Sequence, residues 1–128
     1  MMFSHVTIGT NDLARALAFY DAALAPLGIE RVPSKYQTWA SWQRPGEAAK
    51  LWVGRPYDQM PANQGNGWMV AIAAPTRAAV DAAYAAAMSA GAQDEGPPGL
   101  RTFAPNYYGA YVRDPDGNKL HFVCRAEE

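Results

Sequence analysis

The chain has 128 residues, of which 49% are hydrophobic and 18% are charged, so it is neither disordered nor fibrous and fits one compact domain. Its formal net charge is −1 with scattered basic residues, which argues against a nucleic-acid partner. No apolar run reaches the roughly 18 residues of a membrane span, and the first residues show no signal-peptide pattern. The single cysteine, Cys124, excludes an internal disulfide, and these features together predict a cytoplasmic protein without a membrane segment.

The first half of the chain is predicted to form one strand, one helix and three further strands. Residues 3–9 alternate and are rich in β-branched side chains, which favours a strand. A helix follows, with Asn11 or Asp12 placed to cap its first turn and Gly28 suited to the left-handed residue that ends it. Its apolar stripe recurs at helical spacing and comprises Leu13, Leu17, Tyr20, Leu24 and Leu27. The three short strands are expected at about 29–33, 36–43 and 50–54.

The second half repeats this order after a linker. Residues 55–67 hold two prolines and two glycines without apolar periodicity, which is typical of a linker. A strand is then predicted at 68–74, followed by a helix capped by Thr76 and ended at Gly91. The remaining strands are expected near Gln93 (weak), at about 101–113 (longer) and at about 119–124. One domain over residues 1–128 is therefore expected, with module 1 at about 1–54, the linker at 55–67 and module 2 at about 68–126.

The two halves also align residue by residue. His5 coincides with Met69 at an offset of 64 residues, which is half the chain length. Trp52 coincides with His121 when the last strands of the halves, each following a turn with Pro and Gly, are aligned. The duplicated β-α-β-β-β order predicts an α+β fold built from two similar units.

Three phrases carry a resemblance to a known family: HVTIGTNDLARALAFYDAALAPLGIE, GWMVAIAAPTRAAVDAAYAAAMSAGA and YVRDPDGNKLHFV. Together they resemble the vicinal oxygen chelate (VOC) superfamily, which holds glyoxalase I, fosfomycin and bleomycin resistance proteins and extradiol dioxygenases. The resemblance implies two tandem βαβββ modules that form a cupped, mostly antiparallel sheet with helices outside and a pocket inside. It also implies a divalent metal in many members, and either enzymatic activity or sequestration of a drug.

The resemblance further implies that metal ligands come from the first and last strands of each module. The corresponding positions here are His5, Trp52, Met69 and His121, the same four that the repeat brings together. Tryptophan donates only, and methionine is a soft thioether that suits Cu(I) better than Zn²⁺, Mn²⁺ or Fe²⁺. The family commonly has His at the position of Met69 and Glu at that of His121, so the expected metal site is incomplete and holds only His5 and His121.

Two functions follow as alternatives. One is a metal-dependent lyase or dioxygenase that acts on a small substrate with vicinal oxygens, using Zn, Mn, Fe or Ni. A neutral His121 or His5 is the candidate base for catalysis without a metal, and His121 is the expected catalytic residue. Glyoxalase I activity itself is not expected, because no carboxylate stands at the four positions. The other is metal-free binding of an apolar or aromatic small molecule in a pocket between the two βαβββ modules, in which His5 and His121 are hydrogen-bonded pocket residues.

Aromatic residues concentrate in the predicted strands and would line such a pocket. The expected pocket residues are Trp39, Trp52, Met69, Arg101 and Tyr108. Strand alternation places Tyr107 and Tyr111 on one face and Tyr108 on the other. A homodimer is expected as a partner arrangement.

The segment RDPDGNKLHFV at 113–123 has the composition of a calcium-binding loop. Asp114, Asp116 and Asn118 match the first, third and fifth positions of an EF-hand loop. Lys119, however, stands at the sixth position in place of the invariant glycine, and flanking helices are not predicted. The segment is instead predicted to be a hairpin turn in which Gly117 or Asn118 takes a positive φ, and which sets the register of the strand bearing His121.

Overall fold

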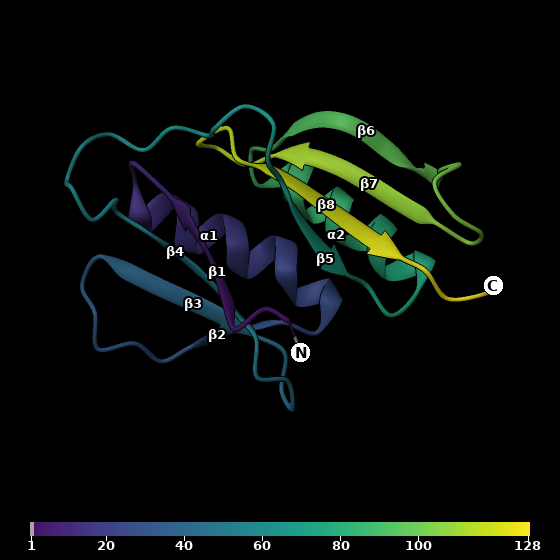
Figure 1. The fold of residues 1–128 in the computed structure, drawn as a ribbon, viewed down its shortest axis with the longest axis horizontal. Coiled ribbons are helices and arrows are strands. Elements are labelled where there is room, and N and C mark those ends of the chain that lie inside the picture. The colour runs from purple at the N-terminus through teal and green to yellow at the C-terminus, as the bar shows by residue number, and fades with distance from the viewer. Residues whose placement is uncertain (1) are drawn as a thin grey trace.

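A computed structural model describes residues 2–128. In chain order its elements are β1 (His5–Gly9), α1 (Leu13–Leu24), the 3-10 turn η1 (Ala25–Leu27), β2 (Glu30–Val32), β3 (Trp39–Gln43), β4 (Lys50–Gly54), β5 (Val70–Ala73), α2 (Arg77–Ser89), β6 (Gln93–Leu100), β7 (Tyr108–Arg113) and β8 (Lys119–Cys124). The predicted α+β order of two βαβββ modules is confirmed, and the linker arcs from module 1 to module 2 in Figure 1.

Each module forms its own four-stranded sheet. The strand orders are β1-β4-β3-β2 and β5-β8-β7-β6, and the two sheets do not close into a barrel. In both sheets the first and last strands of the module run parallel and the other neighbours run antiparallel. Thr7 lies opposite Trp52, and Ala71 lies opposite His121. The registers therefore coincide when the modules are aligned as the sequence repeat predicted.

The helix boundaries follow the predicted capping residues. The Asp12 carboxylate accepts a hydrogen bond from the Arg15 backbone N–H at 3.0 Å, and the Thr76 hydroxyl accepts one from Ala79 N–H at 3.0 Å. Each satisfies an N–H that has no partner within the helix. Gly28 has φ +74°, a left-handed conformation that stops the helical segment at low steric cost.

The strands of module 2 differ from the prediction near residue 100. The strand expected near Gln93 is the eight-residue β6, and its pairing with β7 is interrupted by register shifts around Gly96. The strand expected at 101–113 begins only at Tyr108. The Arg101 N–H donates to the Tyr107 carbonyl at 2.7 Å, which closes residues 101–107 into a hairpin loop, and Asn106 has φ +58°, which no extended strand adopts.

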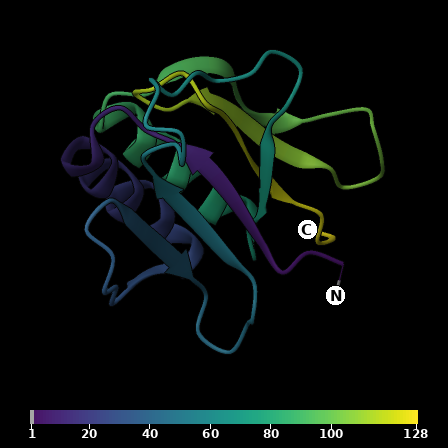
Figure 2. The ribbon, with the colours of Figure 1, turned by 60° about the vertical axis from the view of Figure 1, so that its left-hand side comes forward.

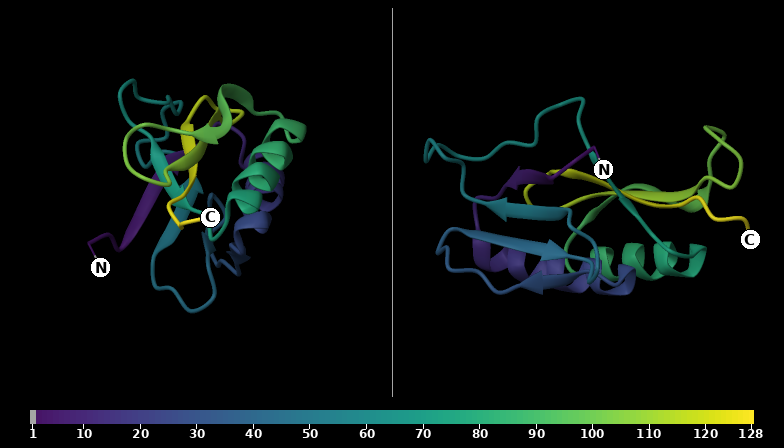
Figure 3. Two further views of the ribbon diagram at one scale, coloured as in Figure 1. Left: turned by 90° about the vertical axis from the view of Figure 1, so that its right-hand side faces the viewer. Right: turned by 60° about the horizontal axis from the view of Figure 1, so that its bottom comes forward.

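Both helices lie on one side of the two sheets and pack against each other, as the right panel of Figure 3 shows. The core fills the space between the helices and the facing strand residues. Its largest fully buried side chains include Phe19, Tyr20, Leu24, Leu27, Trp42, Val53, Val80, Val112, Leu120 and Phe122. The opposite faces of the sheets, which carry no helix, are turned away from this core (Figure 2). Within residues 2–128 neither helix has the length and apolarity that crossing a bilayer requires.

The β7–β8 turn ties module 2 to module 1. Gly117 has φ +90°, as predicted for one of the two candidate turn residues. The Asp114 carboxylate accepts hydrogen bonds from the backbone N–H groups of Asp116 and Asn118, which holds the turn, and a further one from the Tyr20 hydroxyl of α1. The Asn118 side chain donates to the Gly9 carbonyl at 2.9 Å. The turn is thus an intermodule contact as well as a hairpin.

Asp116 extends the same contact. Its carboxylate accepts hydrogen bonds from the Thr10 hydroxyl, the Asn11 backbone N–H and the Arg15 guanidinium. Asp116 therefore accepts hydrogen bonds from donors that would otherwise lack partners where β1 passes into α1. The carboxylates of both Asp114 and Asp116 thus bond to other groups of the protein. The segment resembles a calcium loop in composition, but its carboxylates accept hydrogen bonds from the protein instead.

Replacing Tyr20 with Phe tests this contact. The variant removes a fully buried hydroxyl whose hydrogen bond goes to a carboxylate, and bonds of that kind contribute about 1.5–3 kcal/mol. Urea unfolding is expected to show a loss of about 2 kcal/mol. Tyr84→Phe is the matched control, because its hydroxyl bonds to Asp94 at the exposed surface, and it should change stability by less than about 0.5 kcal/mol. Equal losses in both variants would contradict this role of the turn.

Candidate functional site

We call the face of each sheet that carries no helix its open face. This face carries the strand positions that the repeat aligns. Strand alternation directs Ile8 and Val53 of module 1 toward α1, where both are buried. Their strand neighbours Thr7 and Trp52 therefore lie on the open face, side by side across β1 and β4. The equivalent positions in module 2 are Ala71 and His121.

An aromatic pocket of about 250 Å³ lies on the open face of module 1, lined by His5, Thr7, Tyr36, Trp39 and Trp52. We call it the aromatic site. The Tyr36 and Trp52 rings meet edge to face with centroids 5.9 Å apart, and the Lys50 ammonium lies 5.9 Å from the Trp52 ring centroid. Three of the predicted site residues, His5, Trp39 and Trp52, are thus brought together.

The position of the Trp39 ring in this site depends on a glycine. Trp39 stands opposite Gly54 in the β3–β4 ladder, and a Cβ atom at residue 54 would lie 2.3 Å from the indole ring. Only glycine leaves room for the ring to lie flat on the sheet at this point. The indole is therefore held as one fixed wall of the aromatic site.

His121 occupies a different setting on the open face of module 2. Its ring is fully buried and stacks on Tyr111, with centroids 3.9 Å apart and planes 5° apart, and on Tyr107 at 5.6 Å. Gly109 lies beneath it, since a Cβ there would approach the imidazole to 2.4 Å. The predicted common face of Tyr107 and Tyr111 is confirmed by these two contacts. The cluster of Tyr107, Tyr111 and His121 is compact and leaves no surface of the imidazole in contact with solvent.

Both ring nitrogens of His121 have hydrogen-bond partners. Nδ1 lies 3.0 Å from the Ala110 carbonyl, which can only accept, so Nδ1 carries the proton. In the neutral ring Nε2 is then the acceptor for the Tyr107 hydroxyl at 2.9 Å. Burial lowers the pKa of His121, the hydrogen bond to Ala110 opposes that change, and the positive charges of Arg101 and Lys119 lower the pKa further. The imidazole is therefore held neutral and in one tautomer.

Cations lie over the tyrosines of this cluster. Arg101 and Lys119 lie 5.5 and 5.4 Å from the Tyr111 ring centroid, and Arg125 lies 5.4 Å from that of Tyr107. Arg101 belongs to the 101–107 loop and not to a strand, yet it still reaches the open face. These cation–π contacts cover the rings on their outer side.

Two of the expected pocket residues lie elsewhere. Tyr108 faces α2, where its hydroxyl donates to Asp81 at 2.6 Å and its ring packs against the core, so it lies outside the open face. This follows from the period of two along β7, which turns Tyr108 away from Tyr107 and Tyr111. Met69 directly precedes β5 and is 40% exposed, apart from the residues that line the aromatic site.

The residues present do not fit a divalent-metal centre within one chain. His5 is exposed with Nδ1 bonded to the Ser4 hydroxyl at 3.0 Å, whereas His121 is buried with both nitrogens in use. Trp52 and Met69 cannot supply the missing hard donors. Across residues 2–128 no three His, Cys, Asp or Glu side chains lie close enough together to hold a metal ion.

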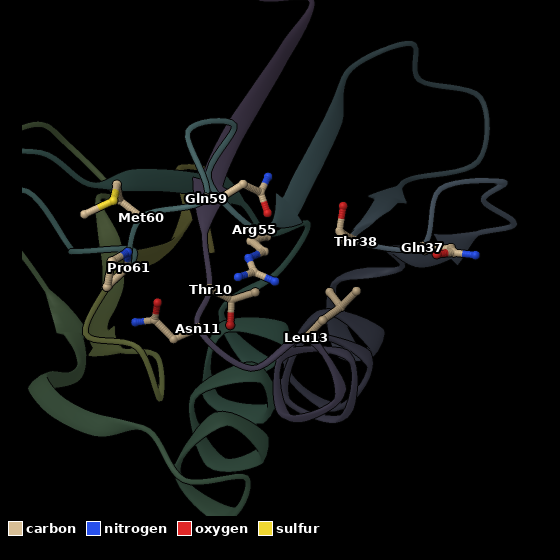
Figure 4. Close-up of a pocket in the computed structure, with 9 residues that line it drawn as sticks. All are labelled: Thr10, Asn11, Leu13, Gln37, Thr38, Arg55, Gln59, Met60 and Pro61. Carbon is tan, nitrogen blue, oxygen red and sulfur yellow. The ribbon is translucent and has the colours of Figure 1, made fainter.

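A second cavity, of about 380 Å³, was not predicted from the sequence. It lies where the linker leaves β4, and Figure 4 shows Arg55 at its centre between Thr10 and Gln59. The only sequence signal was that Arg55 opens the linker, and a linker predicts no site. The elements around this cavity come from four separate parts of the first 61 residues, so only the fold assembles it.

The neutral His121 predicts a specific pH dependence of stability. In the unfolded chain His121 titrates near its ordinary pKa of about 6.5, while the folded chain, with a lowered pKa, stays unprotonated over that range. The unfolded state then binds more protons, so stability is complete above about pH 7 and falls as the pH drops, by at most about 1.4 kcal/mol per pH unit. Urea unfolding at pH 7.5 and 5.5 should show this loss.

The His121→Gln variant should lose that part of the pH dependence, whereas His5→Gln, which changes the exposed histidine, should retain it. Burial raises the pKa of Asp114, which makes stability fall with rising pH in a more acidic range. That contribution is common to all three proteins and cancels in their differences. A His121→Gln protein with the same pH profile as the parent would contradict the neutral buried imidazole.

Comparison with known proteins agrees with this architecture. Residues 2–122 match the family described as Glyoxalase/Bleomycin resistance protein/Dioxygenase superfamily. A solved glyoxalase/bleomycin resistance protein from Albidiferax ferrireducens T118 is 39% identical with a TM-score of 0.87, over 98% of this chain and 100% of that one. A search of curated proteins returned no match.

More distant structures share the fold. A glyoxalase/bleomycin resistance protein/dioxygenase family enzyme from Burkholderia phytofirmans PsJN is 20% identical with a TM-score of 0.74, covering 96% of this chain and 98% of that one. TioX from Micromonospora sp. ML1 is 17% identical with a TM-score of 0.67, covering 98% of each chain. The match over most of the sequence and the duplicated βαβββ fold agree: this chain belongs to the Glyoxalase/Bleomycin resistance protein/Dioxygenase superfamily.

Proposed function

We propose that the chain binds a planar aromatic small molecule in the aromatic site, and that this binding requires no metal ion held by the chain itself. The observation that carries the proposal is the group of three aromatic side chains, Tyr36, Trp39 and Trp52, that lines one pocket on the open face. Membership of a superfamily that includes resistance proteins supports a binding role.

The geometry of the pocket suits a flat ligand. The Trp39 ring is held against Gly54 and the Trp52 ring contacts Tyr36 edge to face, so two walls exist before a ligand arrives. A preformed pocket loses little conformational entropy on binding. Stacked or edge-to-face aromatic pairs add about 0.5–1.5 kcal/mol beyond the burial of apolar area. The polar groups at the rim are the Thr7 hydroxyl and the His5 imidazole, which can orient one polar substituent of the ligand.

The second candidate function is a metal-dependent lyase or dioxygenase. One observation favours it: His5 lies in the aromatic site, and its Nε2 has no hydrogen-bond partner within residues 2–128. Such a centre would need ligands from the substrate or from a second chain in addition to His5. The buried His121 is a poor catalytic base in this arrangement, because Tyr107 occupies its one acceptor nitrogen.

The Trp52→Ala variant tests the aromatic site with 2-naphthol as a neutral planar probe, followed by quenching of tryptophan fluorescence. Saturable binding to the parent protein is expected, with an affinity reduced about tenfold in the variant, equivalent to the loss of about 1.4 kcal/mol. The control is Trp68→Ala, which removes a 40% exposed tryptophan that does not line the site. Binding unaffected by Trp52→Ala, or lost equally in the control, would rule out this site.

Metal analysis of the same preparations separates the two functions. Binding of 2-naphthol that survives treatment with a chelator and the His5→Ala substitution supports metal-free binding. One equivalent of Zn, Mn, Fe or Ni that is lost in His5→Ala would favour the enzyme.

We also propose that two copies of the chain associate through apolar side chains that are exposed in the single chain. The accessible surface of the chain is 7268 Å². A folded monomer of 13.9 kDa is expected to expose about 6,700 Å², so this chain exposes more surface than expected. Large apolar side chains remain exposed on the described chain, among them Phe3, Tyr36, Trp68, Met69 and Phe103. Sedimentation velocity over a range of concentrations is expected to show a dimer, and a monomer at every concentration would contradict this proposal.

A further inference from the structure

The cavity around Arg55 has no assigned role and is separate from the aromatic site. It is lined by Thr10, Asn11, Leu13, Gln37, Thr38, Arg55, Gln59, Met60 and Pro61. None of these residues lines the aromatic site. The segment 36–39 borders both, with Gln37 and Thr38 facing the cavity and Tyr36 and Trp39 facing the aromatic site. We call it the Arg55 cavity.

Backbone hydrogen bonds hold the walls of the Arg55 cavity in place. The Arg55 N–H donates to the Thr38 carbonyl at 3.1 Å, and the Thr10 N–H donates to the Gly54 carbonyl at 2.9 Å. The linker is tied down by Asn11, whose amide exchanges two hydrogen bonds with the Ala62 backbone at 2.7 and 3.1 Å. The cavity is therefore a built feature of the strand ends and the linker.

Among residues 2–128, Arg55 is the only charged residue that lines the cavity. The chain has eight arginines, and seven of them form a hydrogen bond, an ion pair or a cation–π contact with another side chain or a carbonyl group. Across residues 2–128 the Arg55 guanidinium alone has none of these contacts. Figure 4 shows it directed into the middle of the cavity. It leaves one positive charge and up to five N–H donors available to a ligand.

Within residues 2–128 no carboxylate forms an ion pair with Arg55. The Asp116 carboxylate is occupied by Thr10, Asn11 and Arg15. Asp12 caps α1 and Asp58 accepts from the Met60 N–H at 2.9 Å. None of the three carboxylates lines the cavity.

We infer that the Arg55 cavity binds a small carboxylate, with the Arg55 guanidinium pairing with its two oxygens. A guanidinium and a carboxylate are matched in geometry and form two parallel hydrogen bonds. A single positive charge matches a monoanion better than a phosphate dianion. The Leu13 and Met60 side chains supply an apolar wall for a short aliphatic stem, and the Gln37 and Gln59 amides can bond to a hydroxyl or carbonyl group on it. A volume of about 380 Å³ lies at the small end of ligand pockets, which span roughly 300–1,000 Å³.

The full-length protein is titrated by calorimetry with propanoate and with 2-hydroxypropanoate. Saturable binding is expected for both. Propanamide, which has the same shape without charge, should bind about fivefold more weakly, because Arg55 is exposed and an ion pair at an exposed arginine contributes up to about 1 kcal/mol. Propanamide binding as tightly as propanoate, inorganic phosphate binding more tightly than either acid, or no saturable binding of either acid would each overturn the inference.

Two variants of Arg55 and one matched control locate the site. Arg55→Gln should weaken propanoate binding about fivefold, and Arg55→Lys, which keeps the charge but not the paired donors, should give a smaller loss. Arg31→Gln changes an exposed arginine of the same module that pairs with Asp21 outside the cavity, and it should leave the affinity unchanged. Because the exposed Arg55 side chain forms no hydrogen bond or ion pair within residues 2–128, circular dichroism of its variants should match the parent. Equal affinities for Arg55→Gln and the parent protein would overturn the assignment.

The inference is independent of the aromatic site. Binding of 2-naphthol should persist in Arg55→Gln, and binding of propanoate should persist in Trp52→Ala. Loss of propanoate binding in Trp52→Ala but not in Arg55→Gln would place the carboxylate in the aromatic site and overturn the inference.

Discussion

Five hydrogen bonds between the β7–β8 turn and the start of module 1 position the two halves of this molecule. They join Asp114 to Tyr20, Asn118 to Gly9, and Asp116 to Thr10, Asn11 and Arg15. The Asp114 carboxylate also holds the turn, whereas the Asp116 carboxylate bonds to the end of β1 and the first turn of α1. Within residues 2–128 the two sheets share no strand pairing, so this contact, the hydrogen bond from Arg44 to the Ala73 carbonyl and the packing of α2 on α1 and η1 position the modules.

Those constraints leave one face of each sheet without a helix, and the two modules use that face differently. In both, an aromatic or imidazole ring lies flat on a glycine: Trp39 on Gly54 in module 1, and His121 on Gly109 in module 2. In module 1 the ring borders an open pocket. In module 2 the two tyrosines close over the imidazole and bury it. The duplication therefore produced two similar platforms, of which one is a pocket and the other is a packed cluster.

This difference also explains the two histidines. The repeat aligns His5 with Met69 and Trp52 with His121. The two histidines therefore do not occupy equivalent positions, because His5 lies on the first strand of module 1 and His121 on the last strand of module 2. His5 keeps an unpaired nitrogen at the aromatic site, whereas the buried His121 gives both nitrogens to Tyr107 and Ala110. A lone polar group in such a cluster must be satisfied internally, because an unpaired buried donor or acceptor costs about 1–3 kcal/mol. The structure accordingly favours a structural role for the residue that the sequence suggested as a catalytic base.

Local structure and the duplication could be predicted from the order of the residues alone. Asp12, Thr76, Gly28 and Gly117 act through their own backbone neighbours, so capping and turn chemistry could be predicted without the fold. The alternation at residues 107–111 likewise placed Tyr107 and Tyr111 on one face. The strand predicted at 101–113 was wrong over residues 101–107. A backbone hydrogen bond between Arg101 and Tyr107 closes these residues into a loop, and residue propensities do not encode that bond.

Which side chains share a site depends on how distant segments pack in the folded chain. The roles of Asp114 and Asp116 depend on partners about a hundred residues away in sequence, and the Arg55 cavity combines the ends of three strands with the linker. The burial of His121 depends on a loop and two neighbouring strands meeting over Gly109. Contacts of this kind arise from the packing of distant segments, and a pattern that extends over a few residues carries no information about them.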